Sequence, residues 1–514
     1  MLEKVENNEI SLDEVPYPEG YFEGQAPVML DYVCARNGFH SPGCAGAFDW
    51  CEIGCGAGLT ASVLAGANPE ARFTGIDVDE NAIIRAQALA EDADLSNVRF
   101  VCTDIASIDL SDAGSYDYIT LHGVYSWVSE AVRQGIVAFV DACLRPGGVL
   151  YISYNVSPGW AALIPLRERF QTLVKKAQGS ARDRALSAVS ELRRLQQARA
   201  PYFSKMPEAT RYLRVLEQAG PEYALHELFA PQWNLFRFSQ VHCELSAIGL
   251  QFVGNADPVD DLASCAVPPT LVPSVLEIDD VVEREETKDF INNRFFRRDV
   301  YQRRLPGAKQ PRRSRARHWA SGEVLVTTPA PAMALENTVP TPIGSKSVAG
   351  QELDWTHRRL AEAVVPVSEL AKDAVFSHWP DTDIGDWVAL LISGRILQPC
   401  ARALAPRLNS AQRASRVALI LNLNEQLLAR AVAQQTQCVV ASPVTGSAVI
   451  LGPLEAMLLC AHLSQDPIRW VCDAMDKGQI VCDASDNENS AVAKRLSGDF
   501  SRSWLPKLAA LGVV

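Results

Sequence analysis

The chain has 514 residues, of which 48% are hydrophobic and 21% are charged, and its formal net charge is -13. This length predicts about three or four folded domains. The acidic balance repels a phosphate backbone, so the composition argues against general nucleic-acid binding.

The cysteines and the lack of long apolar runs indicate the cellular compartment of the protein. The 13 cysteines are scattered between Cys34 and Cys482, a pattern typical of free thiols in a reducing environment. Cys51 and Cys55 lie close together, but no second Cys or His pair stands at zinc-ligand spacing, so we expect no metal site. The first residues are acidic and polar, unlike a secretory signal, and no apolar run could span a membrane. We therefore expect a cytoplasmic protein without membrane insertion.

Residues 47–154 alternate short β-rich runs with helical segments. We expect strands at 48–53, 72–78, 98–104, 116–121 and 148–154. Pro146, Gly147 and Gly148 predict a turn before the fifth strand. Repeated strand–helix–strand units predict an α/β fold, a doubly wound and mostly parallel Rossmann-like sheet with helices on both faces.

Residues 161–231 are almost wholly helical in pattern and richly charged. This segment is either a solvated amphipathic insert or an element for dimerisation or substrate gating, because helical periodicity alone names no partner. Residues 236–256 then predict a helix, a stop at Gly249 and a strand, which would return the chain to the sheet.

The remaining chain divides around a basic run at 303–317 that contains no acid. The run is a solvated linker or, alternatively, a docking patch for an acidic partner. Its basic residues are Arg303, Arg304, Lys309, Arg312, Arg313, Arg315 and Arg317. We expect a cofactor-binding domain (1–165), a helical dimerisation or regulatory domain (166–255), a middle domain with the linker (256–345) and a mostly helical C-terminal domain (346–514). The last of these carries no catalytic motif.

The strongest chemical signal follows the first strand, where Glu52 precedes a glycine-rich turn. The turn contains Gly54, Cys55, Gly56 and Gly58. Such glycines bring the backbone close to a ligand at a helix N-terminus. Dinucleotide-binding domains share this feature, but Leu59 replaces their third glycine and Glu52 would repel a pyrophosphate. The cationic, phosphate-free cofactor S-adenosylmethionine can use the acid for its amino group.

Two further acids end the next two strands. Asp77, followed by Val78, can accept both ribose hydroxyl hydrogen bonds, and Asp104, followed by Ile105, can accept from the adenine amino group. Three acids at successive strand ends opening onto one crevice predict an S-adenosylmethionine site. We include His122, after the fourth strand, among its contacts.

Three motifs then carry a family resemblance: the run HGVYSWV at 122–128, Ser153-Tyr154-Asn155 and Pro158-Gly159-Trp160. With them, the chain resembles the methyltransferases that carry a predicted methyltransferase regulatory domain, which include the rickettsial protein lysine methyltransferases acting on an outer membrane protein. Residues 224–257 resemble the regulatory domain and 289–300 the stretch that follows it. The likeness covers about residues 15–300 and extends only vaguely to the C-terminal domain.

The resemblance implies a class I methyltransferase domain, a helical dimerisation domain, and middle and C-terminal domains around a wide cleft. It also implies a homodimer. The chain departs from the family at two places. It has Gln25-Ala26-Pro27 where members tend to have Thr-His-Pro or Ser-His-Pro, and Thr60 where an asparagine is common.

The acceptor site is expected after the fourth strand, beside the transferable methyl in this fold. Tyr125, Trp127 and Tyr154 could line a dry aromatic slot that promotes loss of a lysine proton and holds the cation by cation–π contact. Trp127 could instead belong to the core. His122 is either a general base or a residue that contacts only the cofactor.

These features predict methyl transfer to lysine side chains of a protein. The alternatives are methylation of a small molecule or peptide, and a cofactor-sensing interaction protein without turnover. Nucleic-acid methylation is disfavoured by the acidic charge and by the absence of an Asn/Asp-Pro-Pro-aromatic motif after the fourth strand.

Overall fold

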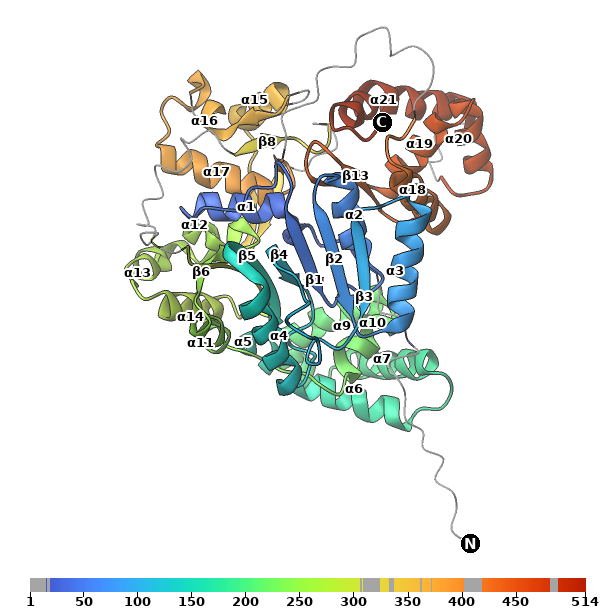
Figure 1. The fold of residues 1–514 in the computed structure, drawn as a ribbon. Coiled ribbons are helices and arrows are strands. Elements are labelled where there is room, and N and C mark those ends of the chain that lie inside the picture. The colour runs from blue at the N-terminus through green and yellow to red at the C-terminus, as the bar shows by residue number, and fades with distance from the viewer. Residues whose placement is uncertain are drawn as a thin grey trace.

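A seven-stranded sheet forms the centre of the molecule in this computed structural model (Figure 1). The structure describes residues 15, 19–305, 307, 324–331, 337–360, 363–370, 372–401, 418–480 and 489–514. The strands are β1 (Asp49–Ile53), β2 (Arg72–Asp77), β3 (Val98–Cys102), β4 (Tyr116–Leu121), β5 (Leu144–Asn155), β6 (Leu250–Asn255) and β7 (Phe296–Arg303). Their order is β3-β2-β1-β4-β5-β7-β6. The first five strands pair in parallel, and β7 is antiparallel to both β5 and β6. The predicted α/β fold with a mostly parallel sheet is confirmed.

The strand positions also agree with the prediction, with one correction. The turn predicted at Pro146–Gly148 lies inside β5, which begins at Leu144. The pairing of β4 with β5 shifts register there, between Tyr116 and Tyr118. Gly147 has φ +79°, a left-handed conformation that suits glycine, so the sequence Pro-Gly-Gly makes a bulge within one long strand.

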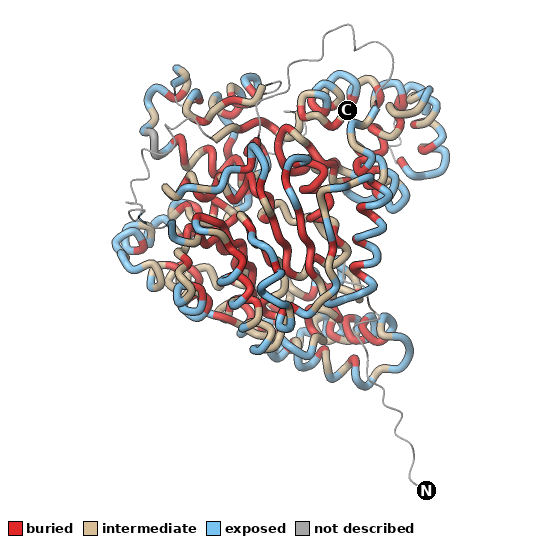
Figure 2. The backbone as a smooth tube through the Cα atoms, viewed as in Figure 1, coloured by how far each residue is buried: buried red, intermediate tan, exposed pale blue. Residues whose placement is uncertain are grey.

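Helices cover both faces of the sheet, and its central strands β1, β4 and β5 are mostly buried (Figure 2). One face packs against α1 (Pro27–Arg36), α2 (Leu59–Ala67) and α3 (Glu80–Asp92). The other face packs against α4 (Glu130–Cys143) and α11 (Phe238–Ala247). Because side chains alternate along a strand, neighbouring residues of β5 enter different cores: Tyr151 lies in the first and Tyr154 in the second.

The segment predicted to be helical forms a layer of its own at one end of the sheet, at the bottom of Figure 1. Its helices are α5 (Ser157–Ala161), α6 (Ile164–Lys176), α7 (Ala181–Gln197), α8 (Pro201–Lys205), α9 (Pro207–Ala219) and α10 (Pro221–Phe229). Their buried side chains make a separate core that includes Trp160, Phe170 and Leu213.

The chain then returns to the sheet, as residues 236–256 predict, with α11 followed by β6. After β6 come α12 (Ala263–Ala266), α13 (Val272–Leu276) and α14 (Val281–Ile291), with short 3-10 turns at Pro258–Asp261 and Pro269–Leu271. The division expected between residues 255 and 256 does not match this arrangement, because β7 pairs with both β5 and β6 in the central sheet.

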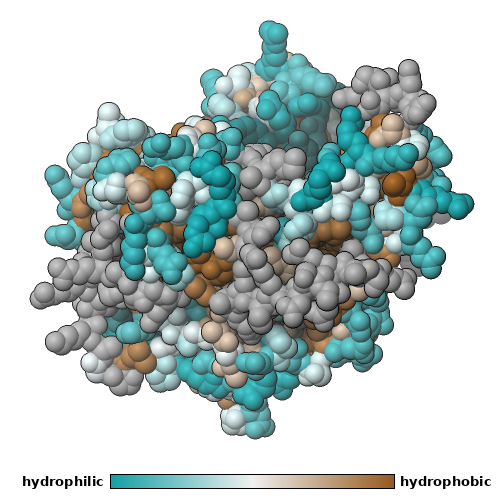
Figure 3. Space-filling model, turned by 90° about the horizontal axis from the view of Figure 1, so that it is seen from above, coloured by the Kyte–Doolittle hydropathy of each residue, from teal (hydrophilic) through white to brown (hydrophobic). Residues whose placement is uncertain are grey.

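The C-terminal residues form two groups of helices above the sheet. The first contains α15 (Gln351–Leu360), α16 (Val367–Leu370) and α17 (Asp381–Ser393), with a small sheet of β8 (Leu325–Thr327), β11 (Val365–Pro366) and β12 (Gln398–Cys400) and a hairpin of β9 (Thr338–Thr341) and β10 (Gly344–Ser347). The second contains α18 (Asn422–Gln434), α19 (Pro453–Leu463), α20 (Pro467–Asp476) and α21 (Asn489–Ala510), with a hairpin of β13 (Cys438–Ser442) and β14 (Ser447–Leu451). Seen from this side, the surface is mostly hydrophilic (Figure 3).

Both C-terminal groups share apolar cores with the cofactor-binding domain. The first group contributes Val388 and Leu391 to the core beneath α1 and α2, and the second packs around Val63 and Ala67 of α2. The region expected as a separate domain is therefore joined to the central domain by buried apolar side chains.

The remaining expectations concern parts of the chain outside the sheet. The basic run lies almost entirely outside the described residues, which include only Arg303 and Arg304 of its members. The 12 cysteines within the described ranges form no disulfide with one another. In those ranges no helix is both long and apolar enough to cross a membrane.

Candidate active site

Three acids lie side by side at the carboxyl edge of the sheet. Glu52 belongs to β1, Asp77 ends β2, and Asp104 follows β3 by two residues. The parallel register pairs Ile53 with Ile76 and Asp77 with Cys102, so the strands end at nearly the same level. In the order β3-β2-β1, the acids therefore follow one another along a single edge, with His122 next, directly after β4.

The glycine-rich turn connects β1 to α2. Gly54, Gly56 and Gly58 all have positive φ values. A Cβ at Gly58 would lie 2.6 Å from the Phe100 ring, so a larger residue does not fit there. At Gly56, by contrast, a Cβ would meet nothing within 4 Å, which leaves open space for a ligand against the backbone. The Cys55 side chain is buried beneath the turn, 8% exposed.

Asp77 joins this turn to the end of β2. Its Oδ2 accepts a hydrogen bond from the Gly56 backbone N–H at 2.7 Å, and its Oδ1 accepts from the Asp79 N–H at 3.0 Å. Each oxygen keeps a further lone pair, as a ribose diol requires. Val78, the next residue, exposes 71% of its surface, which is unusual for valine and offers an apolar patch beside the acid.

The end of β3 matches the expectation only in part. Asp104 is exposed, and its Oδ1 accepts a hydrogen bond from the Ala106 N–H at 2.9 Å. The side chain of Ile105, which we expected among the cofactor contacts, is buried in the core beneath α4. It therefore offers no side-chain surface to a ligand.

Glu52 is a nearly fully buried carboxyl group. Its Oε1 accepts a hydrogen bond from Gln25 Nε2 at 2.9 Å, while its Oε2 has no hydrogen-bond partner. Burial, with a smaller contribution from the charge of Asp77, raises the pKa of Glu52 to about 8. A buried acid with an unpaired oxygen suits a cationic group and repels phosphate, so these residues fit the expected cofactor.

His122 lies next along the edge, packed among aromatic rings. Phe22 stacks on it with ring centroids 3.8 Å apart, and its Nδ1 lies 2.7 Å from the hydroxyl of Tyr151. Burial and the nearby positive charge of Arg298 lower the pKa of His122 to about 3. So weak a base cannot remove the proton of an ammonium group, which favours a contact role over general base catalysis.

A fourth ring completes this cluster. Phe296 of β7 packs edge-on against His122, with centroids 5.6 Å apart. We call Phe22, His122, Tyr151 and Phe296 the aromatic wall. All of them except Tyr151 are partly exposed. Arg298 stands two residues after Phe296 and pairs with Asp257 at 3.1 Å.

The predicted aromatic slot is different from this wall. Tyr125 is fully buried, and its hydroxyl bonds to Glu244 of α11. Tyr154 is also buried, and its hydroxyl donates to Asp299 Oδ2 at 2.6 Å. Both rings lie in the core beneath α4 and α11, so they cannot line an open acceptor slot. Trp127 is only half-buried.

A buried ionic network explains why β7 presents Phe296 and Arg298 to the wall. The alternate residues Arg297 and Asp299 point to the opposite face, where Arg297 is fully buried. Arg297 pairs with Asp299 at 2.9 Å, with Asp289 at 2.7 Å and with Glu285 at 3.0 Å. Removing Arg297 would take a cationic partner from three buried carboxylates, so the network favours this register of β7.

Residues 20–25, which we call the N-terminal strap, cross the carboxyl edge between the acids and the wall. Thr60 of α2 holds the strap by donating to the Gly20 carbonyl at 3.4 Å and accepting from the Phe22 N–H at 3.3 Å. The strap also contacts both C-terminal groups. Tyr21 bonds to Ser447 of β14 at 2.6 Å, and Glu23 pairs with Arg395 at 3.4 Å.

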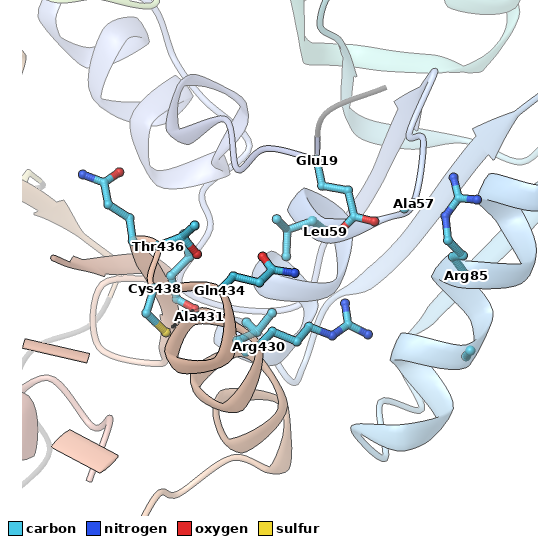
Figure 4. Close-up of a pocket in the computed structure, with 13 residues that line it drawn as sticks. Glu19, Ala57, Leu59, Arg85, Arg430, Ala431, Gln434, Thr436 and Cys438 are labelled. Atoms are coloured by element: carbon cyan, nitrogen blue, oxygen red, sulfur yellow. Dashed lines mark hydrogen bonds between the residues drawn. The ribbon is translucent and has the colours of Figure 1, made fainter. Parts of the chain in front are cut away.

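A pocket of about 640 Å³ opens beside the glycine-rich turn, between α3 and α18 (Figure 4). It is lined by Glu19, Ala57, Leu59, Arg85, Ala88, Leu427, Arg430, Ala431, Gln434, Thr436, Gln437, Cys438 and Val439. Arg85 and Arg430 form no ion pair with any carboxylate that the structure describes. The pocket adjoins the turn at Ala57 but includes neither the three acids nor the aromatic wall.

Sequence reasoning missed Gln25, Phe22, Tyr151, Phe296 and Arg298. Gln25 stands where the chain departs from the family pattern, which gives no reason to expect a ligand contact, and only the tertiary fold brings it and Phe22 to the strand ends. Alternation along β5 puts Tyr151 on the face opposite Tyr154, but it does not say which of the two faces carries the site. Phe296 and Arg298 lie in the segment 289–300, whose resemblance to the family was visible but whose place in the sheet was not.

Comparison with family models gives two matches. Residues 51–150 match a methyltransferase domain, and residues 220–303 match a predicted methyltransferase regulatory domain. The first match runs from β1 to β5, and the second from α10 to the end of β7. The second match therefore contains the strand that supplies Phe296 and Arg298.

Three similar proteins cover between 43% and 98% of this chain. An uncharacterized protein of Synechocystis sp. is 26% identical over 517 residues, spanning 98% of this chain and 99% of the relative. An uncharacterized protein of Rickettsia prowazekii is 32% identical over 227 residues, spanning 43% of this chain and 87% of the relative. The structure of PKMT2 from Rickettsia typhi in complex with AdoHcy superimposes with a TM-score of 0.70 at 18% identity, covering 97% of this chain and 99% of that one. This last likeness is one of fold.

Proposed function

Because the chain belongs to the methyltransferases that carry a predicted methyltransferase regulatory domain, we propose that it methylates lysine side chains of a protein. Its methyl donor is S-adenosylmethionine, which supplies an electrophilic methyl group bound to a positively charged sulfur. The observation that carries the lysine proposal is the aromatic wall around His122, at the strand end next to the three acids.

The residues of the carboxyl edge have distinct roles in holding this cofactor. Asp77 would bind the ribose hydroxyls, Asp104 and the exposed Val78 would contact the adenine, and Glu52 would receive the amino group. Gly56 leaves the backbone open to the ligand. The similar Rickettsia typhi protein forms a complex with AdoHcy, the demethylated form of the same cofactor, which supports this assignment.

The acceptor must reach the wall as a neutral amine, because only a nitrogen with a free lone pair can attack the methyl group. An unperturbed lysine has a pKa of about 10.4. The partly exposed rings of Phe22 and Phe296 offer an apolar path that disfavours the charged form. The potential of Arg298, which contributes to the low pKa of His122, acts on a lysine in the same direction.

The wall therefore serves as a positioning device more than as an acid or base. Holding the amine in line with the methyl group supplies much of the rate in such a displacement. Trp127, half-buried just beyond His122, is a further candidate for this surface. We assign Tyr125 and Tyr154 to the support of the wall and not to the wall itself.

Transfer of a labelled methyl group into a cell lysate tests the proposal. The protein and small-molecule fractions are counted separately, and labelled proteins are digested to locate methylated lysines. An Asp77→Ala variant serves as the inactive control. Label in lysine residues is the expected result. Label confined to small molecules would replace the proposal with the alternative acceptor class, and no transfer to any fraction would favour a cofactor-sensing role.

We further propose that the helical layer α5–α10 forms a homodimer. It exposes several apolar side chains, including Leu186 of α7 and Val215 of α9, which are 48% and 41% exposed. Light scattering at micromolar concentration should give twice the chain mass of 56.1 kDa. The double variant Leu186→Glu, Val215→Glu should be monomeric if these side chains form the interface, whereas a monomeric wild type would contradict the proposal.

A further inference from the structure

Two buried oxygen atoms near the glycine-rich turn have no hydrogen-bond partner. One is Oε1 of Gln25, a fully buried side chain, and the other is Oε2 of Glu52, which is 3% exposed. Their side chains are joined by the bond from Gln25 Nε2 to Glu52 Oε1 at 2.9 Å. Buried polar atoms in folded proteins are nearly always paired, so two unpaired acceptors on directly bonded side chains require an explanation.

The orientation of Gln25 follows from its partner. Its Nε2 donates to the carboxyl group, and turning the amide over would bring two acceptor oxygens together whenever Glu52 is ionised. The backbone of Gln25 is also held, because its carbonyl accepts from Trp50 Nε1 at 3.3 Å and α1 begins two residues later, at Pro27. Its Oε1 is therefore left as an acceptor in a rigid place.

We propose that Gln25 Oε1 and Glu52 Oε2 together receive the ammonium group of the amino-acid end of S-adenosylmethionine, which makes Gln25 a cofactor-binding residue. This inference rests on the methyltransferase assignment but not on the identity of the acceptor. Two acceptor oxygens, one of them on an ionisable carboxyl group, favour a ligand that donates hydrogen bonds over a carboxylate or a phosphate. An ammonium group has three N–H donors and can satisfy both oxygens at once.

The electrostatics of the pair agree with a cationic ligand. Burial raises the pKa of Glu52 to about 8, and the charge of Asp77 adds to the effect. Cys55 and Tyr151 also lie close enough to interact with Glu52, and neither of them supplies a positive charge. An ammonium group bound at the pair would stabilise the carboxylate, so cofactor binding at pH 7 should release a proton.

Access to the pair requires movement of the strap. Neither unpaired oxygen has solvent-accessible surface, because Gln25 itself ends the strap and covers Glu52. The strap is held by Thr60 on one side and by Ser447 and Arg395 of the C-terminal groups on the other. Through these contacts, the C-terminal region therefore helps to position Gln25, and with it the site for the amino-acid end of the cofactor.

Calorimetric titration with two ligands tests the proposal. S-adenosylhomocysteine carries the amino-acid end, and 5′-methylthioadenosine lacks it. In Gln25→Leu we expect about a tenfold loss of affinity for S-adenosylhomocysteine and less than a twofold change for 5′-methylthioadenosine. Gln398→Leu is the matched control, since Gln398 is also buried with an unpaired Oε1 but lies on β12. It should leave both affinities unchanged.

Equal losses for the two ligands would assign Gln25 a merely structural role, and an unchanged affinity for S-adenosylhomocysteine would remove it from the site. Should Gln25→Leu fail to fold, the wild-type protein gives an independent readout. Binding enthalpies in phosphate and in Tris at pH 7 should reveal proton release with S-adenosylhomocysteine and none with 5′-methylthioadenosine. Equal proton release with both ligands, or none with either, would overturn the proposal. No methyl acceptor is present in these titrations, so their outcome is independent of the lysine proposal.

Discussion

The two halves of the carboxyl edge are built in different ways. In the cofactor half, Glu52, Asp77 and Asp104 each belong to a strand end or its next residues, and short helix-forming segments connect those strands. In the acceptor half, the aromatic wall combines residues 22, 122, 151 and 296, which come from the strap, from the residue after β4, and from β5 and β7. Apart from Gln25, the cofactor half is thus made from about 60 consecutive residues, whereas the acceptor half is assembled across about 270.

This difference predicts how well each half of the site tolerates substitutions elsewhere in the chain. A residue of the cofactor half depends mainly on its own strand and the adjoining turn, so a distant substitution should leave it in place. The acceptor half depends on the strap, on the ionic network behind β7 and on contacts to both C-terminal groups. We therefore expect substitutions far from the site to change methyl transfer more readily than cofactor affinity.

The largest expected effect concerns the cofactor half. If Asp77 binds the ribose as proposed, Asp77→Ala removes two charge-assisted hydrogen bonds, each contributing roughly 1.5–3 kcal/mol. Calorimetry should show that the Kd for S-adenosylhomocysteine rises by about 100-fold or more. Asp79→Ala is the control, because Asp79 caps α3 through the Asn81 and Ala82 N–H groups. Unchanged affinity in a folded Asp77→Ala protein would remove this acid from the site.

The acceptor half should respond in the opposite way. Phe296→Ala opens the wall beside His122 and should reduce methyl transfer about tenfold, through loss of positioning, while cofactor affinity changes less than twofold. Phe295 is a matched control, since the preceding ring packs against Trp160 at 5.8 Å in the helical layer. If Phe295→Ala and Phe296→Ala reduce transfer equally, the wall has no special role.

The same difference explains what could be predicted from sequence. The parallel sheet and the acids at its edge were predictable, because strand ends in this fold meet at one edge and the glycine-rich turn marks the first of them. The strap was not predictable, since nothing in its sequence indicates that Gln25 bonds to Glu52. The chain departs from the family pattern at Gln25 and Thr60. Gln25 lies in the strap, and Thr60 forms hydrogen bonds that hold the strap.

The aromatic residues show a second limit. Tyr154 ends the predicted strand 148–154 within a family motif, which predicts a place in the site, but its ring points to the face covered by α4 and α11. Tyr151, three residues earlier, points to the other face and reaches His122. Alternation along a strand separates the two faces, yet it does not say which face carries the site. Only the positions of Phe22 and Phe296 decide that.

A pH profile tests whether His122 acts as a base. At saturating cofactor, the rate should rise about tenfold per pH unit below the pKa of the bound lysine, since only the neutral amine attacks. His122, with a pKa of about 3, is already neutral across pH 5–9 and should add no inflection. His122→Asn should therefore lower the rate without changing the shape of the profile. An inflection near pH 6.5 that disappears in this variant would restore the general-base role.

The smallest effects distinguish the two tyrosines of β5. Tyr154→Phe removes the hydrogen bond to Asp299 and leaves a buried acid short of one partner, which should lower the free energy of unfolding by about 1–3 kcal/mol. Methyl transfer per folded molecule should change little. Tyr151→Phe frees His122 Nδ1, so we expect a few-fold loss of transfer with a smaller loss of stability.

Urea unfolding and single-turnover assays on both variants make this comparison directly. We expect Tyr154→Phe to lose more stability and Tyr151→Phe to lose more methyl transfer. The reason is that the Tyr154 hydroxyl faces the ionic network, whereas the Tyr151 hydroxyl faces the site. Matching rankings would mean that the two faces of β5 are not functionally separate. In that case methyl transfer would depend on the ionic network behind β7 as strongly as on the aromatic wall. Tyr154, which we assigned to the support of the wall, would then itself help to position the amine.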